Sequence, residues 1–309
     1  MPTVRNYLSL IKFSHTIFAM PFALIGFCLA AYPQIAGWFG RPEEAAARVD
    51  DKPLWLLFLL VVGCMIFARS AAMAFNRYLD RSFDQQNPRT AIREIPAGIL
   101  KANSVLLFTI VNCILFVTCT FFINSLCFYL SPVALAVVLG YSYTKRFTPL
   151  CHLVLGLGLS LAPIGAYLAV TGAFHWLPIL FSLAVIFWVS GFDIIYALQD
   201  EEFDRSQQLY SIPAALGKVR ALRVSELLHL LSAASVVIAG VYGEFGWLYW
   251  LGVLVFGGML IYQHSIVKPT DLRRVNLAFM TANGIASVVF AVFVIGDLFF
   301  FHHQQLLAA

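Results

Sequence analysis

The sequence has few charged residues and lacks any polar stretch long enough to form a separate soluble domain. Charged side chains make up 12% of the 309 residues, whereas hydrophobic side chains make up 61% and the mean hydropathy is +0.83. Soluble domains carry about 25% charged residues, so the composition indicates an integral membrane protein. The short alternating segments of a membrane β-barrel are also missing, because the apolar runs are long and uninterrupted, as in helices.

Cysteine and histidine spacings typical of a metal site are absent as well. The six cysteines lie within or beside apolar runs, and we expect them to be buried as small apolar residues. The seven histidines are scattered without ligand spacing. The first apolar run has no small-residue cleavage site and is too long for the core of a signal peptide, so we expect it to be retained as a span.

We predict an all-α integral membrane protein with nine transmembrane helices, forming a single domain over residues 1–309. Several apolar runs are near the short end of the roughly 17–25 residues that a spanning helix needs. The predicted spans are 16–38, 54–75, 105–123, 126–143, 153–170, 179–195, 227–242, 247–266 and 277–301.

Basic residues are concentrated on one side of this predicted bundle. The N-terminus and the loops after the second, fourth, sixth and eighth spans hold 17 of the 20 Lys and Arg residues, and the other side has only Arg41, Arg48 and Lys52. The positive-inside rule therefore predicts a cytoplasmic N-terminus and an outside C-terminus, in a bacterial inner membrane. The net charge of +4 is explained by this topology and by anionic lipid rather than by nucleic acid. Nothing in the sequence indicates a required protein partner.

Two polar segments repeat one spacing at the cytoplasmic ends of apolar runs. Asn76, Asp80 and Asp84 are four residues apart, and Tyr196, Asp200 and Asp204 repeat this pattern 120 residues later. Residues four apart share one face of a helix, so each set predicts a polar column. Each column opens a long loop, at about 76–103 and about 199–226, and long loops are usually functional.

The two loops also share the tripeptide Ile-Pro-Ala, at 95–97 and at 212–214. Its recurrence at a similar distance after a matching acidic spacing predicts an internal repeat. A parallel repeat would bring the two motifs face to face across a pseudo-two-fold axis.

Oxygen-rich columns of this kind suit Mg²⁺, which takes few protein carboxylates and completes its coordination with water and substrate phosphate. Arginines between the acids suit the phosphate itself, since guanidinium groups bind phosphate oxygens as a fork. The alternative is that the acids are solvated loop residues paired with nearby arginines. Asp193 lies deeper, within an apolar run, where an ionisable residue is costly and usually functional.

Three stretches resemble the UbiA-type intramembrane aromatic prenyltransferases. The first motif of that family is similar to NRYLDRSFD at 76–84, and the second to DIIYALQDEEFD at 193–204. The basic stretch after the family's fourth helix resembles YSYTKRF at 141–147. The likeness covers nearly the whole chain and shows no departure at the acidic positions.

The resemblance implies a helical bundle around a central cavity that is open sideways to lipid and capped by the two cytoplasmic loops. It implies a Mg²⁺-dependent reaction in which a polyprenyl diphosphate ionises and the carbocation attacks an aromatic ring, typically ortho to a phenol. Within the family the chain looks most like the 4-hydroxybenzoate polyprenyltransferases of ubiquinone synthesis. A bicyclic naphthoate acceptor, as in menaquinone synthesis, is the alternative.

The resemblance also assigns expected roles by position. Metal ligands would be Asp80, Asp84, Asp200 and Asp204, of which Asp80 and Asp200 are also expected to be catalytic together with Asp193. Substrate contacts would be Asn76, Arg77, Arg81, Lys145, Arg146 and Tyr196, to the polyprenyl diphosphate or to a small aromatic acid. Asp193 is our candidate for accepting the phenolic proton. The alternative role of Asp193 is to orient an arginine or a metal-bound water.

Other function classes are less consistent with the sequence. A protoheme farnesyltransferase or a chlorophyll synthase would keep the chemistry and change the acceptor. A CDP-alcohol phosphotransferase requires an Asp-Gly-x-x-Ala-Arg start, which is absent. A cation transporter would need carboxylates at mid-membrane, whereas these acids cluster at one end. The sequence sets no length for the prenyl chain.

Overall fold

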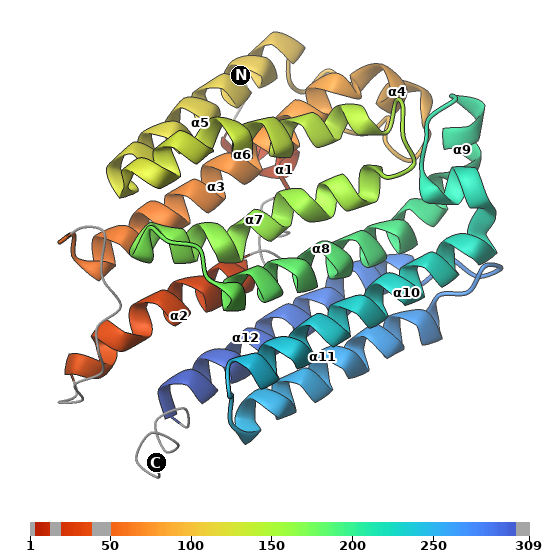
Figure 1. Ribbon diagram of the computed structural model, residues 1–309. Helices are drawn as coiled ribbons and strands as arrows, with labels where there is room; N and C mark the ends of the chain where they lie inside the picture. Colours follow the sequence, from red (N-terminus) through yellow and green to blue (C-terminus); the bar gives the residue numbers. More distant parts are fainter. Residues whose placement is uncertain (1–3, 13–19, 39–50, 301–309) are drawn as a thin grey trace.

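The computed structural model describes residues 4–12, 20–38 and 51–300, and in this part of the chain all named elements are helices (Figure 1). The long helices are α2 (Met20–Trp38), α3 (Leu54–Leu79), α5 (Ala102–Ile123), α6 (Ser125–Thr144), α7 (Cys151–Thr171), α8 (Trp176–Ala197), α10 (Ile212–Tyr242), α11 (Trp247–Ile266) and α12 (Asn283–Phe300). The short elements are α1 (Val4–Leu10), α4 (Arg81–Gln86), a 3-10 turn at Leu198–Asp200, α9 (Glu201–Ser206) and a π-helical segment at Leu277–Ala282 that leads into α12.

Each of the nine predicted spans coincides with a long helix, and seven of the helices are long and apolar enough to cross a membrane. The all-helical membrane class is therefore confirmed. The remaining two predicted spans correspond to α2 and α11, and the total of nine stays a prediction. The predicted start of the first span at 16 and the end of the last at 301 lie outside the described residues, as do both ends of the predicted domain.

Aromatic side chains fill the core between α8 and its neighbours. Trp188 of α8 is fully buried, and its ring lies 5.4 Å from that of Phe22 on α2 and 5.9 Å from that of Phe256 on α11. The Trp188 indole donates a 2.9 Å hydrogen bond to Asn283, which keeps its only polar atom paired inside the apolar core. This core fixes α8, the helix that carries Asp193 near its C-terminal end.

Small residues let the helices approach closely, as is common in membrane bundles. A Cβ atom added at Gly26 on α2 would lie 2.0 Å from the Pro163 carbonyl oxygen on α7. A Cβ added at Gly191 on α8 would lie 2.2 Å from the His229 ring on α10. Side chains at both contacts would therefore push the helices apart.

One buried acid at the opposite end of the bundle has a structural role. Asp297 on α12 is fully buried and accepts hydrogen bonds from the backbone N–H groups of Gly246, at 2.7 Å, and Tyr249, at 3.1 Å. It therefore satisfies the free N–H groups at the start of α11.

The second cytoplasmic loop is shorter than the sequence predicts. The stretch expected at about 199–226 consists of α9, a short turn and the first turns of α10. Ser211 caps α10, because its hydroxyl accepts from the Ala214 N–H. Gly217, with φ of 78° and ψ of 161°, then interrupts the helix with a kink, which separates this polar start from the apolar part.

The two Ile-Pro-Ala copies differ in structure. The copy at 95–97 lies in a series of turns, where Gly98 has a φ of 72°, whereas the copy at 212–214 forms the first turn of α10. A shared tripeptide therefore does not give a shared local structure here, and the internal repeat stays a prediction.

Candidate active site

The two acidic segments meet at one end of the bundle, where α4 and α9 lie (Figure 1). The contact is made by Arg89 from the first loop, whose guanidinium donates to both oxygens of Asp200 at 3.0 and 2.5 Å. Arg89 also donates to the Tyr196 hydroxyl at 3.1 Å, and Asn87 donates to Asp200 at 3.2 Å. A planar fork on a carboxylate fixes both partners in orientation. The first loop therefore positions Asp200, the first of the two aspartates at 200 and 204.

The acids of the first segment are held mainly by residues near them in sequence. Asn76 donates to Asp80 at 3.0 Å, and Asp84, which is buried, pairs with Arg93 at 2.6 Å. The longer 3.5 Å contact between Asp80 and Arg146 is the one link to another loop. Burial is the main cause that raises the pKa of Asp80, and the neighbouring charge of Asp84 adds to it.

Asp204 is the most enclosed acid of the second segment. Its side chain has no exposed surface, and it lies 2.7 Å from the Lys145 ammonium and accepts from the Ser211 hydroxyl at 2.8 Å. Burial would lower the pKa of Lys145, but the attraction of Asp204 outweighs burial and raises it. Lys145 therefore remains charged and binds Asp204 in the absence of any other cation.

Arginines at the end of α3 differ in their surroundings. Arg77 is buried, and its Nε has no hydrogen-bond partner. Arg81 is exposed, stacks 4.5 Å above the Tyr78 ring and donates to the Tyr78 carbonyl at 2.6 Å. Arg146 donates to the Leu79 carbonyl at 3.0 Å.

Asp193 is paired with a residue that the sequence analysis passed over. Its carboxylate lies 2.7 Å from Nδ1 of His152, in the first turn of α7. His152 was set aside because the histidines show no ligand spacing. The sequence did offer one indication of its role: His152 is an ionisable residue at the start of an apolar helix, where burial is costly and a partner is needed.

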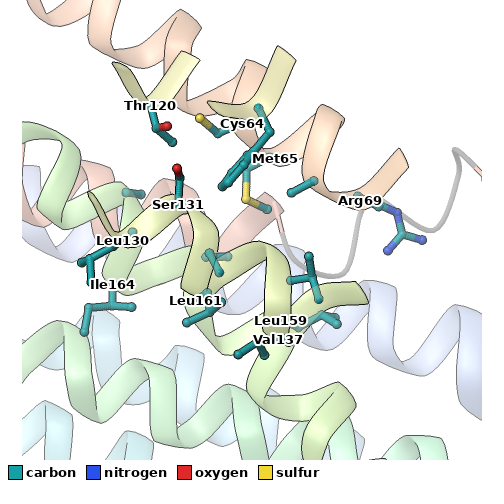
Figure 2. Close-up of a pocket in the computed structure, with 18 of the residues that line it drawn as sticks. Cys64, Met65, Arg69, Thr120, Leu130, Ser131, Val137, Leu159, Leu161 and Ile164 are labelled. Atoms are coloured by element: carbon teal, nitrogen blue, oxygen red, sulfur yellow. The ribbon is translucent and has the colours of Figure 1, made fainter. Parts of the chain in front are cut away.

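An apolar pocket of about 390 Å³ lies between α3, α5, α6 and α7 (Figure 2). Its lining on α3 extends from Val61 to Met73, which is about 18 Å of helix. Tyr141 lines the pocket, and the charges of Asp80 and Asp193 act on it, so Tyr141 lies between the pocket and the acidic residues.

Arg69 is the one charged residue among those that line the pocket, and Figure 2 shows its side chain at one end of it. Its Nε is buried without a hydrogen-bond partner. Arg69 lies inside α3, within the predicted span 54–75 and seven residues before Asn76. Seven residues are about two helical turns, so both residues face the same side of α3.

The donor atoms at this end of the bundle fit a hard divalent cation. Asp84 Oδ2 is buried without a hydrogen-bond partner, and a free buried carboxylate oxygen is the donor that Mg²⁺ prefers. Within the described residues, no group of three or more His, Cys, Asp or Glu side chains is close enough to hold a metal ion. An ion here would therefore need oxygen ligands from a substrate, as Mg²⁺ commonly has.

A family model described as the UbiA prenyltransferase family matches residues 19–294. The chain belongs to this family. The resemblance noted in the two acidic motifs is thus confirmed, as is the prediction of an aromatic prenyltransferase similar to those that act on 4-hydroxybenzoate.

Curated UbiA-family relatives match most of the chain. A 4-hydroxybenzoate octaprenyltransferase of Aeromonas hydrophila is 31% identical over 89% of this chain and 93% of its own length. One from Nitrosomonas europaea is 29% identical over 89% of this chain and 91% of its own length.

Solved UbiA structures share the fold. The apo structure of a UbiA homolog from Aeropyrum pernix K1 has a TM-score of 0.74 at 27% identity, and covers 92% of this chain and 96% of the homolog. A UbiA homolog from Archaeoglobus fulgidus, solved bound to DMAPP and Mg²⁺, has a TM-score of 0.69 at 20% identity, over 95% of this chain and 99% of the homolog.

Proposed function

We propose that this protein transfers a polyprenyl group from a polyprenyl diphosphate to 4-hydroxybenzoate, in ubiquinone-type quinone synthesis. The observation that carries the proposal is the meeting of two acidic segments, interleaved with Arg and Lys, beside an apolar pocket that contains one arginine. The names of the curated relatives support 4-hydroxybenzoate as the acceptor. A naphthoate acceptor would keep the same chemistry.

Four carboxylates are the proposed ligands of Mg²⁺: Asp80, Asp84, Asp200 and Asp204. When bound, Mg²⁺ neutralises the negative charge that develops on the diphosphate leaving group. The ion pairs of these acids with Arg89, Arg93 and Lys145 are consistent with this role, because the same basic side chains can turn to phosphate oxygens.

The diphosphate would also be bound by groups that surround the carboxylates: Asn76, Arg77, Arg81, Lys145, Arg146 and Tyr196. Of these, the Arg77 guanidinium is buried with a free donor, which favours a ligand anion. Arg81 would have to leave the Tyr78 ring to reach the diphosphate.

The apolar pocket suits the hydrocarbon part of the reaction. Its lining of Leu, Val, Ile, Ala and Met side chains favours a prenyl chain, since burial of apolar surface is favourable. Arg69 has a free donor in this apolar wall and suits the carboxylate of an aromatic acid.

In the proposed reaction, the C–O bond to the diphosphate breaks and the ring carbon ortho to the hydroxyl bonds to the allylic carbon. Asp193 accepts the proton of the phenol oxygen, and the hydrogen on the attacked ring carbon then moves to that oxygen as the ring regains aromaticity. The acceptor thus loses one proton overall, and the diphosphate leaves with the electron pair of the broken C–O bond. Asp193 suits this step because it is half-buried and lies near Tyr141 at the edge of the pocket.

The reaction would take place at the cytoplasmic face of the inner membrane, with the N-terminus inside and the C-terminus outside. The distribution of basic residues supports this orientation. A cation transporter is not favoured, since the buried acid at the far end, Asp297, is occupied by the start of α11.

The test is an assay of purified, detergent-solubilised protein with geranyl or farnesyl diphosphate and Mg²⁺. The acceptors are 4-hydroxybenzoate, 1,4-dihydroxy-2-naphthoate, 1,4-dihydroxy-6-naphthoate and heme, with products read by mass spectrometry. Prenylated 4-hydroxybenzoate that disappears with EDTA supports the proposal. If only a naphthoate gives a product, the proposed acceptor changes to that naphthoate and the proposed mechanism stays the same.

Two variants serve as controls for the site. Asp84→Ala and Asp204→Ala should each abolish prenyl transfer in membranes that contain wild-type amounts of the protein. Intact transfer in both variants would contradict the roles proposed for the acidic segments.

A further inference from the structure

His152 contacts both the proposed catalytic acid and the second cytoplasmic loop. The ring is 3% exposed, with Nδ1 lying 2.7 Å from Asp193 and Nε2 lying 3.3 Å from the backbone nitrogen of Ile212. These contacts come from three different helices, α7, α8 and α10. A buried side chain that uses both ring nitrogens is fixed in orientation.

The neighbours of the ring determine which nitrogen carries the proton. The backbone nitrogen of Ile212 can only donate a hydrogen bond, so Nε2 of His152 must accept it. Nδ1 therefore carries the hydrogen and donates to the Asp193 carboxylate. In this tautomer, the hydrogen bond from His152 holds the Asp193 carboxylate in one orientation.

The same contact links Asp193 to the proposed metal ligands. Ile212 follows Ser211, whose hydroxyl donates to Asp204 at 2.8 Å, and Asp204 pairs with Lys145 at 2.7 Å. Two sets of polar contacts, connected through the Ser211–Ile212 peptide bond, thus link the proposed proton acceptor to a proposed metal ligand.

We propose that His152 is a positioning residue for prenylation of the acceptor: its Nδ1–H orients the Asp193 carboxylate toward the acceptor phenol, and its Nε2 anchors that pair to the first residue of α10. The inference rests on the proposed function. His152 itself takes no proton in the step, since its only free lone pair is used by the Ile212 N–H.

This role predicts which part of the reaction depends on His152. The hydrogen bond from His152 to Asp193 should increase the rate of prenylation when a neutral phenol must lose its proton. It should have a smaller effect on the rate when the phenol is already ionised. The diphosphate is bound by other residues, so its affinity should not depend on the His152 ring.

Three substitutions separate the two ring contacts. His152→Asn keeps an amide donor close to the position of Nδ1, His152→Gln moves the amide toward the position of Nε2, and His152→Phe removes both contacts. We expect kcat with 4-hydroxybenzoate to fall about 100-fold in His152→Phe and in His152→Gln, the lower end of the range for proton-transfer catalysis. The kcat of His152→Asn should remain within about tenfold of wild type, because this variant keeps the hydrogen-bond donor to Asp193, on which the proposed role depends.

The decisive measurement repeats the assay with 3-fluoro- and 3-nitro-4-hydroxybenzoate, whose phenols are more acidic. The loss in His152→Phe should shrink to less than about tenfold with the nitro compound, because its phenol needs no proton acceptor. The dissociation constant of geranyl diphosphate with Mg²⁺ should stay within about twofold of wild type.

An equal loss with all three acceptors would overturn the inference, as would a His152→Asn variant no better than His152→Phe. If His152→Phe fails to fold, the comparison of His152→Asn with His152→Gln on the same acceptors decides the question. A wild-type protein that prenylates no acceptor would overturn the proposed function as well. A wild-type product unchanged by the His152 variants would overturn this inference alone.

Discussion

The two acidic segments have similar sequences and are held in different ways. Acids of the first segment are paired mostly within their own loop, as the contact of Asp84 with Arg93 illustrates. Acids of the second segment are paired by other parts of the chain: Asp200 by Arg89 of the first loop, and Asp204 by Lys145 after α6. The second segment is therefore the place where three connections between helices meet at one end of the bundle.

This difference separates what a motif encodes from what the fold adds. A local pair such as Asp84 with Arg93 can form wherever the first loop folds. The second segment keeps its geometry only when the first loop and the α6–α7 connection are in place, because both of its paired acids depend on them. Changes in the second segment should therefore affect stability as well as activity.

The largest expected effect comes from Asp204→Asn compared with Asp84→Asn. Each should lower kcat by about 1,000-fold or more if the acids bind metal, since a lost charge at such a site removes stabilisation of the leaving group. Asp204→Asn should also lower Tm by about 2–4 °C more than Asp84→Asn, because the Asp204–Lys145 pair joins two separate connections of the chain, whereas Arg93 lies in the same loop as Asp84. Thermal unfolding in detergent measures this. Equal Tm values for the two variants would contradict the comparison.

The next effect compares two arginines. Arg89→Lys should lower kcat/KM by about 30-fold, because lysine cannot form the fork to Asp200 and also reach the Tyr196 hydroxyl. Arg93→Lys should lower it by only about threefold, because Arg93 makes a single contact with Asp84 that a lysine can replace. Steady-state kinetics with varied geranyl diphosphate measure both. A larger loss of kcat/KM in Arg93→Lys than in Arg89→Lys would show that the pairing of the first segment is the more important for activity.

Much of this organisation follows from sequence patterns, and some of it does not. Apolar runs located the long helices, because a membrane-crossing helix must be apolar over most of its length. The four-residue spacing located the acids at the ends of α3 and α8. Pairings such as Asp193 with His152 and Asp200 with Arg89 join residues 41 and 111 positions apart. No local pattern encodes such pairings, since they depend on how the helices pack.

Loop boundaries were also beyond the sequence pattern. The start of α10 is polar, with Lys218, Arg220 and Arg223, so it resembled a loop. It is helical because Ser211 caps it and Pro213 suits the first turn. The role of Arg69 was also beyond the pattern, because the sequence does not show that this charged residue of the second predicted span lines a pocket.

The third effect concerns the glycines that follow the two Ile-Pro-Ala copies. Gly217→Ala should lower stability by about 1–3 kcal/mol, because a φ of 78° with ψ of 161° is available almost only to glycine. Gly98→Ala should cost only about 1 kcal/mol, since a Cβ there meets nothing within 4 Å and a φ of 72° is strained but not clashing. Chemical denaturation of the two variants measures the difference. A larger loss for Gly98→Ala would show that the first loop is the more constrained.

The smallest effect is expected for the exposed arginines of each segment. Arg81→Ala should raise KM for geranyl diphosphate about three- to fivefold, because Arg81 must give up its contact with Tyr78 before it can bind phosphate. Arg205→Ala should change KM less than about twofold, since the exposed Arg205 side chain is already engaged by the buried Glu201 carboxylate and by the Ala214 carbonyl. Competition by inorganic diphosphate in both variants reports on the same site without the prenyl chain. An equal rise of KM in Arg205→Ala and Arg81→Ala would contradict this difference. It would mean that exposed arginines of both segments bind the diphosphate.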